Sequence, residues 1–321
     1  MPSPQAASRA TIVSIGEAMV EFNQVRAGET AYVQGFGGDT SNCLIAAARQ
    51  GASTRYLSRV GGDAFGRMLL ELWRREGVDT AFIEVDEAAP TGVYFVTHTS
   101  GGHEFGYLRA GSAASRLAPS SVRAGLFDGA RFLHVSGITQ AISTSACDAS
   151  FQAMAAAREQ GIEIAYDPNL RLKLWPLARA RAVVRASIEQ ADLLLVSADD
   201  ATALTGQTDP QAMRDTLLAW GANTLLLKLG AEGVMLHAQG RSETIAGHRV
   251  KALDATGAGD CFAGALLARI AMGDELREAT RYANAAAALS TLGYGAIGPI
   301  PRAEDVQPLL ARSPADAAPP A

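Results

Sequence analysis

Short apolar runs alternate with longer segments of helical periodicity through most of the chain. Residues 193–196 form a run that is too short for a helix and that has the length of a buried strand. Residues 41–49 instead place apolar side chains at helical spacing and are followed by a glycine that ends a helix. Strands separated by helices of this length predict right-handed crossovers. The pattern therefore predicts an α/β fold in which a central, mostly parallel sheet is flanked by helices on both faces.

The pattern also gives the extent of each element. The predicted strands of the main sheet are 11–15, 55–60, 132–135, 163–166, 193–196 and 224–229. The predicted helices are 41–49, 65–76, 143–160, 178–190, 213–220, 260–272 and 275–292.

A different, β-rich pattern interrupts this alternation. Two β-rich stretches, 91–99 and 103–108, are joined by a Ser-Gly-Gly turn and predict a hairpin. Together with strands near 19–23 and 31–36, they predict a small second sheet, formed by about 17–36 and 82–112. Residues 1–9 and 313–321 are rich in Ser, Pro and Ala, so they are expected to be disordered tails around one domain, 10–312.

Composition narrows the class of protein. The 321 residues carry a net charge of -5, which argues against a nucleic-acid or anionic-membrane surface. No apolar run approaches the roughly 18 to 20 residues of a membrane span, and the N-terminal residues do not have the pattern of a secretory signal. The three cysteines and five histidines are scattered and form no zinc motif, so we expect apolar core cysteines and a cytoplasmic protein.

The stretch 254–260 (DATGAGD) carries the strongest candidate chemistry. Gly257, Ala258 and Gly259 lie where a helix is predicted to begin, so their N–H groups can converge on an anion together with the helix dipole. Such a turn suits a phosphate or a developing oxyanion. Asp260 lies in the first helical turn, where a general base for a hydroxyl is needed. A plain glycine turn with a first-turn carboxylate is the alternative that the residues alone leave open.

This stretch matches neither the GxxxxGK[ST] loop nor the GxGxxG fingerprint. It resembles the C-terminal signature of the ribokinase-like (PfkB) carbohydrate kinases, and departs from it only at Ala255, where the family more often has Thr, Ser or Pro. Residues 37–42 (GGDTSN), continued by Gly51 and by 61–66 (GGDAFG), resemble the N-terminal signature of the same family. The resemblance covers about residues 11–312.

The resemblance implies the ribokinase-like fold, with the small sheet as a lid, and phosphorylation of a sugar hydroxyl by Mg-ATP with Asp260 as the base. It also assigns a set of residues to the nucleotide. These are Asn169, Ser197, Lys228, Gly230, Gly233, Gly257, Gly259 and Asn284. For Lys228, the alternative is a strand-end lysine in solvent.

The family's Asn-x-x-Glu motif, linked to magnesium, appears here only in altered form. Asp200 keeps a carboxylate for an indirect contact with the metal, whereas Ser197 replaces the amide, and this puts the metal network at that point in question. Because Mg²⁺ is held mainly by nucleotide phosphates and water, we still expect the ion to bind.

Two arginines bear on the choice of sugar. Arg109 and Arg171 lie in separate segments, 107–113 (YLRAGSA) and 167–175 (DPNLRLKLW). Both guanidinium groups can converge on one carboxylate by two-pronged hydrogen bonds, and a neutral hexose needs no such cation. A surface salt bridge for Arg109 and a triphosphate contact for Arg171 are the alternatives.

Within the family, this combination is similar to the 2-keto-3-deoxygluconate kinases, although DPNLR also occurs in fructokinases. By that resemblance, one set of residues would line a sugar-acid site. These are Gly38, Asp39, Asn42, Tyr94, Tyr107, Arg109, Arg171 and Asp260.

The resemblance thus implies ATP-dependent phosphorylation of 2-dehydro-3-deoxy-D-gluconate at its C6 hydroxyl. A fructokinase, or a kinase for another sugar acid or ketose, is the alternative in the same class, and a catalytically silent sensor is the alternative in another class. A base behind an intact Gly-Ala-Gly turn argues against the sensor. We expect the lid to have an exposed β face, and hence a homo-oligomer that forms through it.

Overall fold

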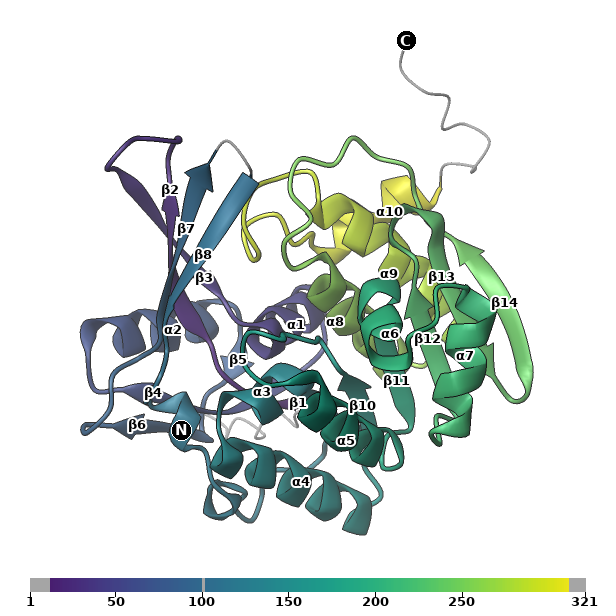
Figure 1. Ribbon diagram of the computed structural model, residues 1–321, viewed down its shortest axis with the longest axis horizontal. Coiled ribbons are helices and arrows are strands. Elements are labelled where there is room, and N and C mark those ends of the chain that lie inside the picture. The colour runs from purple at the N-terminus through teal and green to yellow at the C-terminus, as the bar shows by residue number, and fades with distance from the viewer. Residues whose placement is uncertain (1–11, 100–101, 312–321) are drawn as a thin grey trace, which may run out of the picture.

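The computed structural model describes residues 12–99 and 102–311. The predicted tails, 1–9 and 313–321, and the hairpin turn at 100–101 lie outside the described residues. A large sheet with helices on both faces forms the body, and a smaller sheet stands beside it, at the upper left in Figure 1.

Within the described residues, the large sheet has ten strands and is mostly parallel, as predicted. Its strands follow the order β14 (Arg241–Ala246), β13 (Gly233–Ala238), β12 (Thr224–Lys228), β11 (Leu193–Ser197), β10 (Glu163–Asp167), β9 (Phe132–Ser136), β1 (Ile12–Ile15), β4 (Thr54–Gly61) and β5 (Val78–Asp79), and β6 (Ile83–Asp86) also pairs with β4. The antiparallel pairs are β12 with β13 and β13 with β14, so the antiparallel part lies at one edge.

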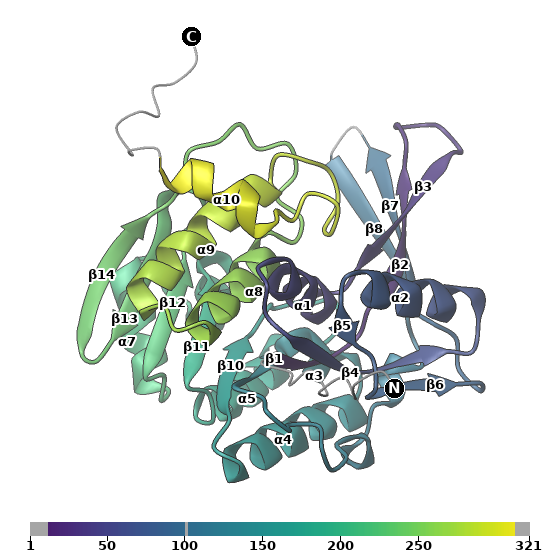
Figure 2. The ribbon, with the colours of Figure 1, turned by 180° about the vertical axis from the view of Figure 1, so that it is seen from behind.

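Helices cover both faces of this sheet. On the face toward the viewer in Figure 2 lie α1 (Asp39–Arg49), α2 (Ala64–Arg75), α8 (Ala258–Ala271), α9 (Leu276–Ser290) and α10 (Ala303–Leu310). On the face toward the viewer in Figure 1 lie α3 (Gly137–Ile142), α4 (Thr144–Glu159), α5 (Leu177–Ile188), α6 (Ala198–Thr205) and α7 (Pro210–Ala219). Successive side chains of a strand pack into two separate cores on opposite faces of the sheet, since Ile12 lies in one core and Val13 in the other.

The small sheet has the strand order β3 (Tyr32–Gly37), β2 (Met19–Gln24), β7 (Val93–Thr99) and β8 (Gly102–Leu108). One of its faces packs on the body, because Phe22 meets Phe65 of α2 with ring centroids 5.9 Å apart. The other face carries Tyr94 and Tyr107, whose rings stack at 5.7 Å. The predicted second sheet is therefore confirmed, although β6 of the segment assigned to it belongs to the large sheet.

The structure also shows the state of the cysteines and the character of the helices. Cys43, Cys147 and Cys261 are buried and carry free thiols. Within the described part of the chain, no helix has both the length and the apolarity that a membrane crossing requires.

Helices α1 and α8 pack against each other without intervening side chains at one point. A Cβ atom placed on Gly264 of α8 would lie 2.1 Å from the carbonyl oxygen of Cys43 and 2.7 Å from the Cβ of Ala46, both in α1. Only a residue without a side chain permits this approach. The packing sets the distance between the first turns of the two helices.

We therefore expect Gly264→Ala to force α1 and α8 apart. Overpacking of this kind costs about 1–3 kcal/mol, which denaturant titration and thermal unfolding would measure as a lower midpoint. Gly106→Ala is the matched control, because a Cβ on Gly106 has open space around it. Equal midpoints for the two variants would contradict this account of the helix contact.

Candidate active site

The first turns of α1 and α8 meet beside the carboxyl ends of the parallel strands. Asn42 of α1 donates from its Nδ2 to Oδ2 of Asp260 in α8 at 2.9 Å. The Oδ1 atom of Asn42 is buried and has no hydrogen-bond partner among the described residues. An unpaired buried acceptor is costly, so this atom is suited to receive a ligand hydroxyl beside Asp260.

The glycine turn ahead of Asp260 begins helix α8, but its amides are not all available as predicted for Gly257, Ala258 and Gly259. Gly257 caps α8 with a φ of 76°, a left-handed conformation that favours glycine. The N–H of Ala258 donates to the carbonyl of Ala255 at 3.2 Å, so this amide is already engaged. Because first-turn N–H groups lack intrahelical acceptors, Gly259 and Asp260 contribute the amides that remain suited to an anion.

The carboxyl group of Asp260 is perturbed in the direction that a base requires. Burial and then the nearby charge of Asp39 raise its pKa to about 8, while Asn42 and Lys228 oppose that rise. A carboxyl group with a pKa near neutrality can hold a proton and release it again at physiological pH.

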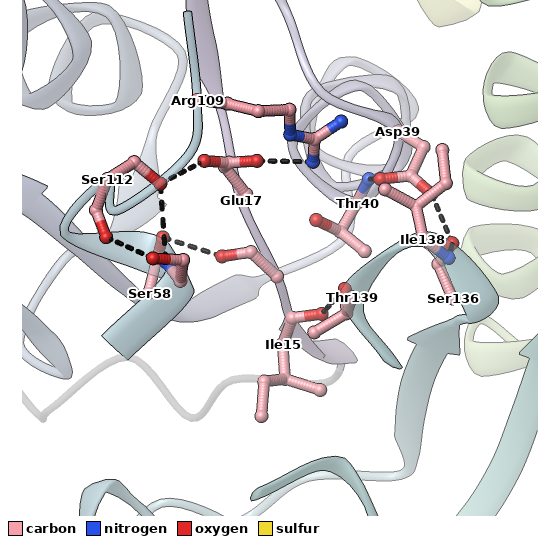
Figure 3. Close-up of polar contacts among 12 residues, drawn as sticks. Ile15, Glu17, Asp39, Thr40, Ser58, Arg109, Ser112, Ser136, Ile138 and Thr139 are labelled. Atoms are coloured by element: carbon pink, nitrogen blue, oxygen red, sulfur yellow. Dashed lines mark hydrogen bonds and ion pairs between the residues drawn. The ribbon is translucent and has the colours of Figure 1, made fainter. Parts of the chain in front are cut away.

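Asp39 lies at the start of α1 and its carboxylate is held from several sides. Its Oδ2 accepts from the hydroxyl of Ser136 (Figure 3), and its Oδ1 accepts from the N–H of Thr40 at 2.8 Å. Its Oδ2 also accepts from Nδ2 of Asn169 at 3.0 Å. Gly38, just before it, has a φ of 132°, and a Cβ there would lie 2.5 Å from the carbonyl oxygen of Glu17. Asn169 was predicted to bind the nucleotide, yet it contacts Asp39, which was predicted to bind the sugar.

Arg109 follows β8 and does not extend freely into the site. Its Nη2 donates to Oε2 of Glu17, whose side chain is 1% exposed, and Ser112 donates to Oε1 of the same carboxylate at 2.6 Å (Figure 3). The Nε of Arg109 is buried and has no hydrogen-bond partner in the described structure. Arg109 therefore has a counter-ion and one unused donor, a combination that the sequence did not reveal.

The remaining predicted sugar residues are placed less uniformly. The hydroxyl of Tyr94 donates to Glu21, so it is engaged, while Tyr107 is exposed and its ring lies 5.8 Å from the Arg109 guanidinium carbon. Arg171 is exposed, and its Nη1 donates to the carbonyl of Leu170 at 2.9 Å. The two arginines thus make separate contacts, and the expected joint clamp is not formed in advance.

A groove of about 650 Å³ lies beside the glycine turn. The predicted nucleotide residues that line it are Lys228, Gly230, Gly233, Gly259 and Asn284. Asn284 also donates to the carbonyls of Ile245 and Ala246 at 3.1 and 3.2 Å, which holds β14 against α9. The predicted residues outside this lining are Asn169, Ser197 and Gly257; the hydroxyl of Ser197 accepts from the N–H of Asp200 at 3.1 Å and caps α6.

Lys228 forms an ion pair between the ends of two strands. Its Nζ lies 2.6 Å from Oδ2 of Asp167, at the end of β10, with β11 between the two strands. Burial opposes the charge of Lys228, but the carboxylates of Asp167, Asp260 and Asp200 outweigh it and raise its pKa. The alternative of a solvated strand-end lysine is thereby removed, since the side chain is 13% exposed.

Asp200 keeps its carboxyl group in the same region. Burial and then the charge of Asp167 raise its pKa. In the described parts of the chain, no three His, Cys, Asp or Glu side chains gather as a metal site. The carboxylates of Asp200 and Asp167 are suited to bind water molecules of a divalent cation.

Two functional candidates, Glu17 and Asp167, were missed at the sequence level. Each carries a carboxylate at or just past the end of a buried parallel strand, β1 or β10, which is where ligands bind in open α/β sheets. That position was the available signal. The partners of the two residues follow only from the spatial order of strands.

Comparisons with known proteins identify the family of the chain. The sequence profile described as pfkB family carbohydrate kinase matches residues 9–303. The chain is 36% identical over 309 residues to 2-dehydro-3-deoxygluconokinase of Thermoproteus tenax, with 94% of each chain covered, and 35% identical over 324 residues to Fructokinase-2 of Solanum lycopersicum, with 95% of this chain and 97% of that one covered.

A solved structure is similar over the whole fold. The crystal structure of fructokinase from Vibrio cholerae O395 with fructose, ADP and calcium ion bound is 27% identical to this chain, with a TM-score of 0.86, and the match covers 94% of this chain and 99% of that one. The mostly parallel sheet with its small second sheet is the ribokinase-like fold. The chain belongs to the pfkB family of carbohydrate kinases.

Proposed function

We propose that this sugar kinase phosphorylates 2-dehydro-3-deoxy-D-gluconate at its C6 hydroxyl, with ATP as the phosphoryl donor and Asp260 as the general base. The observation that carries the choice of substrate is Arg109, a partly buried arginine whose buried Nε donor is unused and is suited to bind a carboxylate oxygen. The 36% identity to a 2-dehydro-3-deoxygluconokinase supports the same choice.

The proposed chemistry divides the site into a sugar side and a phosphate side. Asn42 and Asp260 hold the primary hydroxyl, and Asp260 takes its proton as the oxygen attacks the γ-phosphorus. The first-turn amides of α8 bind the charge on the transferring group, and the groove that includes Gly230 and Gly233 holds the nucleotide. Mg²⁺ bound with ATP would neutralise phosphate charge, and Asp200 would orient its water molecules.

A specific contact favours fructose as a second candidate. Glu17 neutralises Arg109, so the pair presents no net charge, which is what a neutral ketose requires. Fructokinases at 35% identity are as similar to this chain as the acid kinase is. The test is ATP-dependent ADP release from 2-dehydro-3-deoxygluconate, 2-dehydro-3-deoxygalactonate, fructose, ribose and gluconate in parallel. A preference for fructose would overturn the proposed substrate.

We expect the combined change Arg109→Met and Glu17→Gln to separate the two candidates. Removing both charges avoids an unpaired buried carboxylate, so the fold should persist. For the sugar acid, kcat/KM should fall about 100-fold, because a charge-assisted hydrogen bond contributes roughly 1.5–3 kcal/mol and orients the substrate. For fructose it should change about threefold at most. Equal losses for both sugars would contradict a carboxylate contact.

We expect Asp260→Asn to lower kcat by roughly 10²–10⁴-fold. In the native protein, kcat/KM should rise with pH toward a plateau with an apparent pKa near 8, because the base must be ionised.

Between the unfolded pKa of about 3.9 and 8, the native state binds more protons than the unfolded state, so the free energy of unfolding contributed by Asp260 falls as pH rises. In thermal unfolding, Asp260→Asn should lose the part of the decrease in stability with rising pH that Asp260 causes. The same dependence of stability on pH in both proteins would contradict the raised pKa.

We further propose that the exposed face of the lid joins two copies of the chain. Val33 is 62% exposed and Phe105 is 38% exposed, and they occupy one cross-strand row with Asn23 and Val96. Val33→Glu with Phe105→Glu should convert the oligomer to a monomer in light scattering after size exclusion. Val85→Glu is the control, because Val85 is 50% exposed on β6 of the large sheet. A monomeric native protein would contradict this assembly.

A further inference from the structure

The region around Lys228 contains more negative than positive charge. The negative charges of Asp167, Asp260 and Asp200 raise the pKa of Lys228. The negative charge of Asp39 in turn raises the pKa of Asp260. A transferring phosphoryl group adds further negative charge at this point. Phosphoryl transfer therefore needs cations that are positioned in advance.

The Lys228 ammonium is placed against the turn that would hold this group. A Cβ atom on Gly259 would lie 3.4 Å from Nζ of Lys228, so the ammonium packs on the second residue of α8. Lys228 also lines the nucleotide groove together with Gly259. Its charge thus lies at the groove, beside the backbone of Gly259, whose amide is suited to an anion.

Asp167 holds the Lys228 ammonium when no nucleotide is bound. It pairs with Nζ through Oδ2 and accepts from the N–H of Asn169 through Oδ1 at 3.1 Å, so its carboxylate is fixed on the loop after β10. The pair bridges β10 and β12 across β11, which brings the ammonium over the carboxyl edge of the sheet. A rotation about the end of the flexible lysine side chain is enough to exchange a carboxylate oxygen for a phosphate oxygen.

We propose that Lys228 is a catalytic residue whose ammonium moves from Asp167 to the γ-phosphoryl oxygens during transfer. The sugar oxygen forms a bond to the γ-phosphorus as the bond from that phosphorus to the β–γ bridging oxygen breaks, and ADP leaves. The hydroxyl proton passes to Asp260, and Lys228 stays protonated throughout. The role requires the ATP-dependent reaction of the family and Asp260 as its base, but not the particular sugar proposed above.

The experiment compares Lys228→Met, Asp167→Asn and the double variant, each with the sugar that the native enzyme prefers. We expect Lys228→Met to lower kcat by roughly 10²–10³-fold, as the loss of one group that stabilises transition-state charge does, with KM for ATP changed by less than about threefold. The double variant should stay as inactive as Lys228→Met. If it instead recovers the activity of Asp167→Asn, Lys228 only neutralises Asp167 and the proposal fails.

Binding of a transition-state mimic gives a second readout that does not depend on turnover. With sugar present, calorimetry should show that ADP with aluminium fluoride binds the native enzyme more tightly than ADP alone. Lys228→Met should lose that difference, at least tenfold in Kd, while ADP alone binds as before. An undiminished difference would overturn the proposal.

If Lys228→Met fails to fold, the activity and binding assays can still test the proposal with the double variant. The double variant leaves no unpaired buried charge and should fold, so it can be compared with Asp167→Asn in both assays. Lys228→Arg keeps the charge and should restore part of kcat. A native enzyme that fails with every sugar acid but turns over fructose would reject the proposed substrate and leave the role of Lys228 testable with fructose.

Discussion

The close approach of α1 and α8 is the contact on which the candidate site depends. Gly264 lets the backbone of α1 come to the surface of α8, and this places Asn42 within 2.9 Å of Asp260. The two residues are far apart in the sequence and belong to the two halves of the chain. The helix packing fixes their separation to the length of a hydrogen bond, and the proposed binding of a substrate hydroxyl beside them depends on that separation.

The electrostatics of the site follow from its position at the carboxyl edge of a buried sheet. Carboxylates end or follow several strands there, and low solvent exposure raises the pKa of Asp260 and Asp200. Two arrangements offset this charge, Lys228 with Asp167 and Arg109 with Glu17. Buried pairs of this kind do not by themselves stabilise a fold, because desolvation offsets much of their attraction. Under the roles proposed for Lys228 and Arg109, the pairs would hold cations where ligands bring negative charge.

Much of the architecture could be predicted from the sequence, because buried strands are apolar runs and long helices have a marked period. Several of the elements that were missed are short or polar. Helix α6 begins with two aspartates, and β14 has a single buried residue, so neither shows an apolar pattern. In the site, the pair of Asn42 and Asp260 agrees with the predicted motifs, whereas the partners of Arg109 and Lys228 depend on which strands are neighbours. Strand order is a property of the whole chain, and no local pattern encodes it.

The side chain of Asn284 serves two surfaces at once. It lines the nucleotide groove, and its amide binds the carbonyls of Ile245 and Ala246 in β14, which is the outermost strand of the large sheet. Outermost strands expose unpaired backbone groups and are sites of intermolecular pairing. Changes at this position that alter nucleotide preference would also release part of that strand. A substitution of Asn284 would therefore act on the edge of the sheet as well as on the groove.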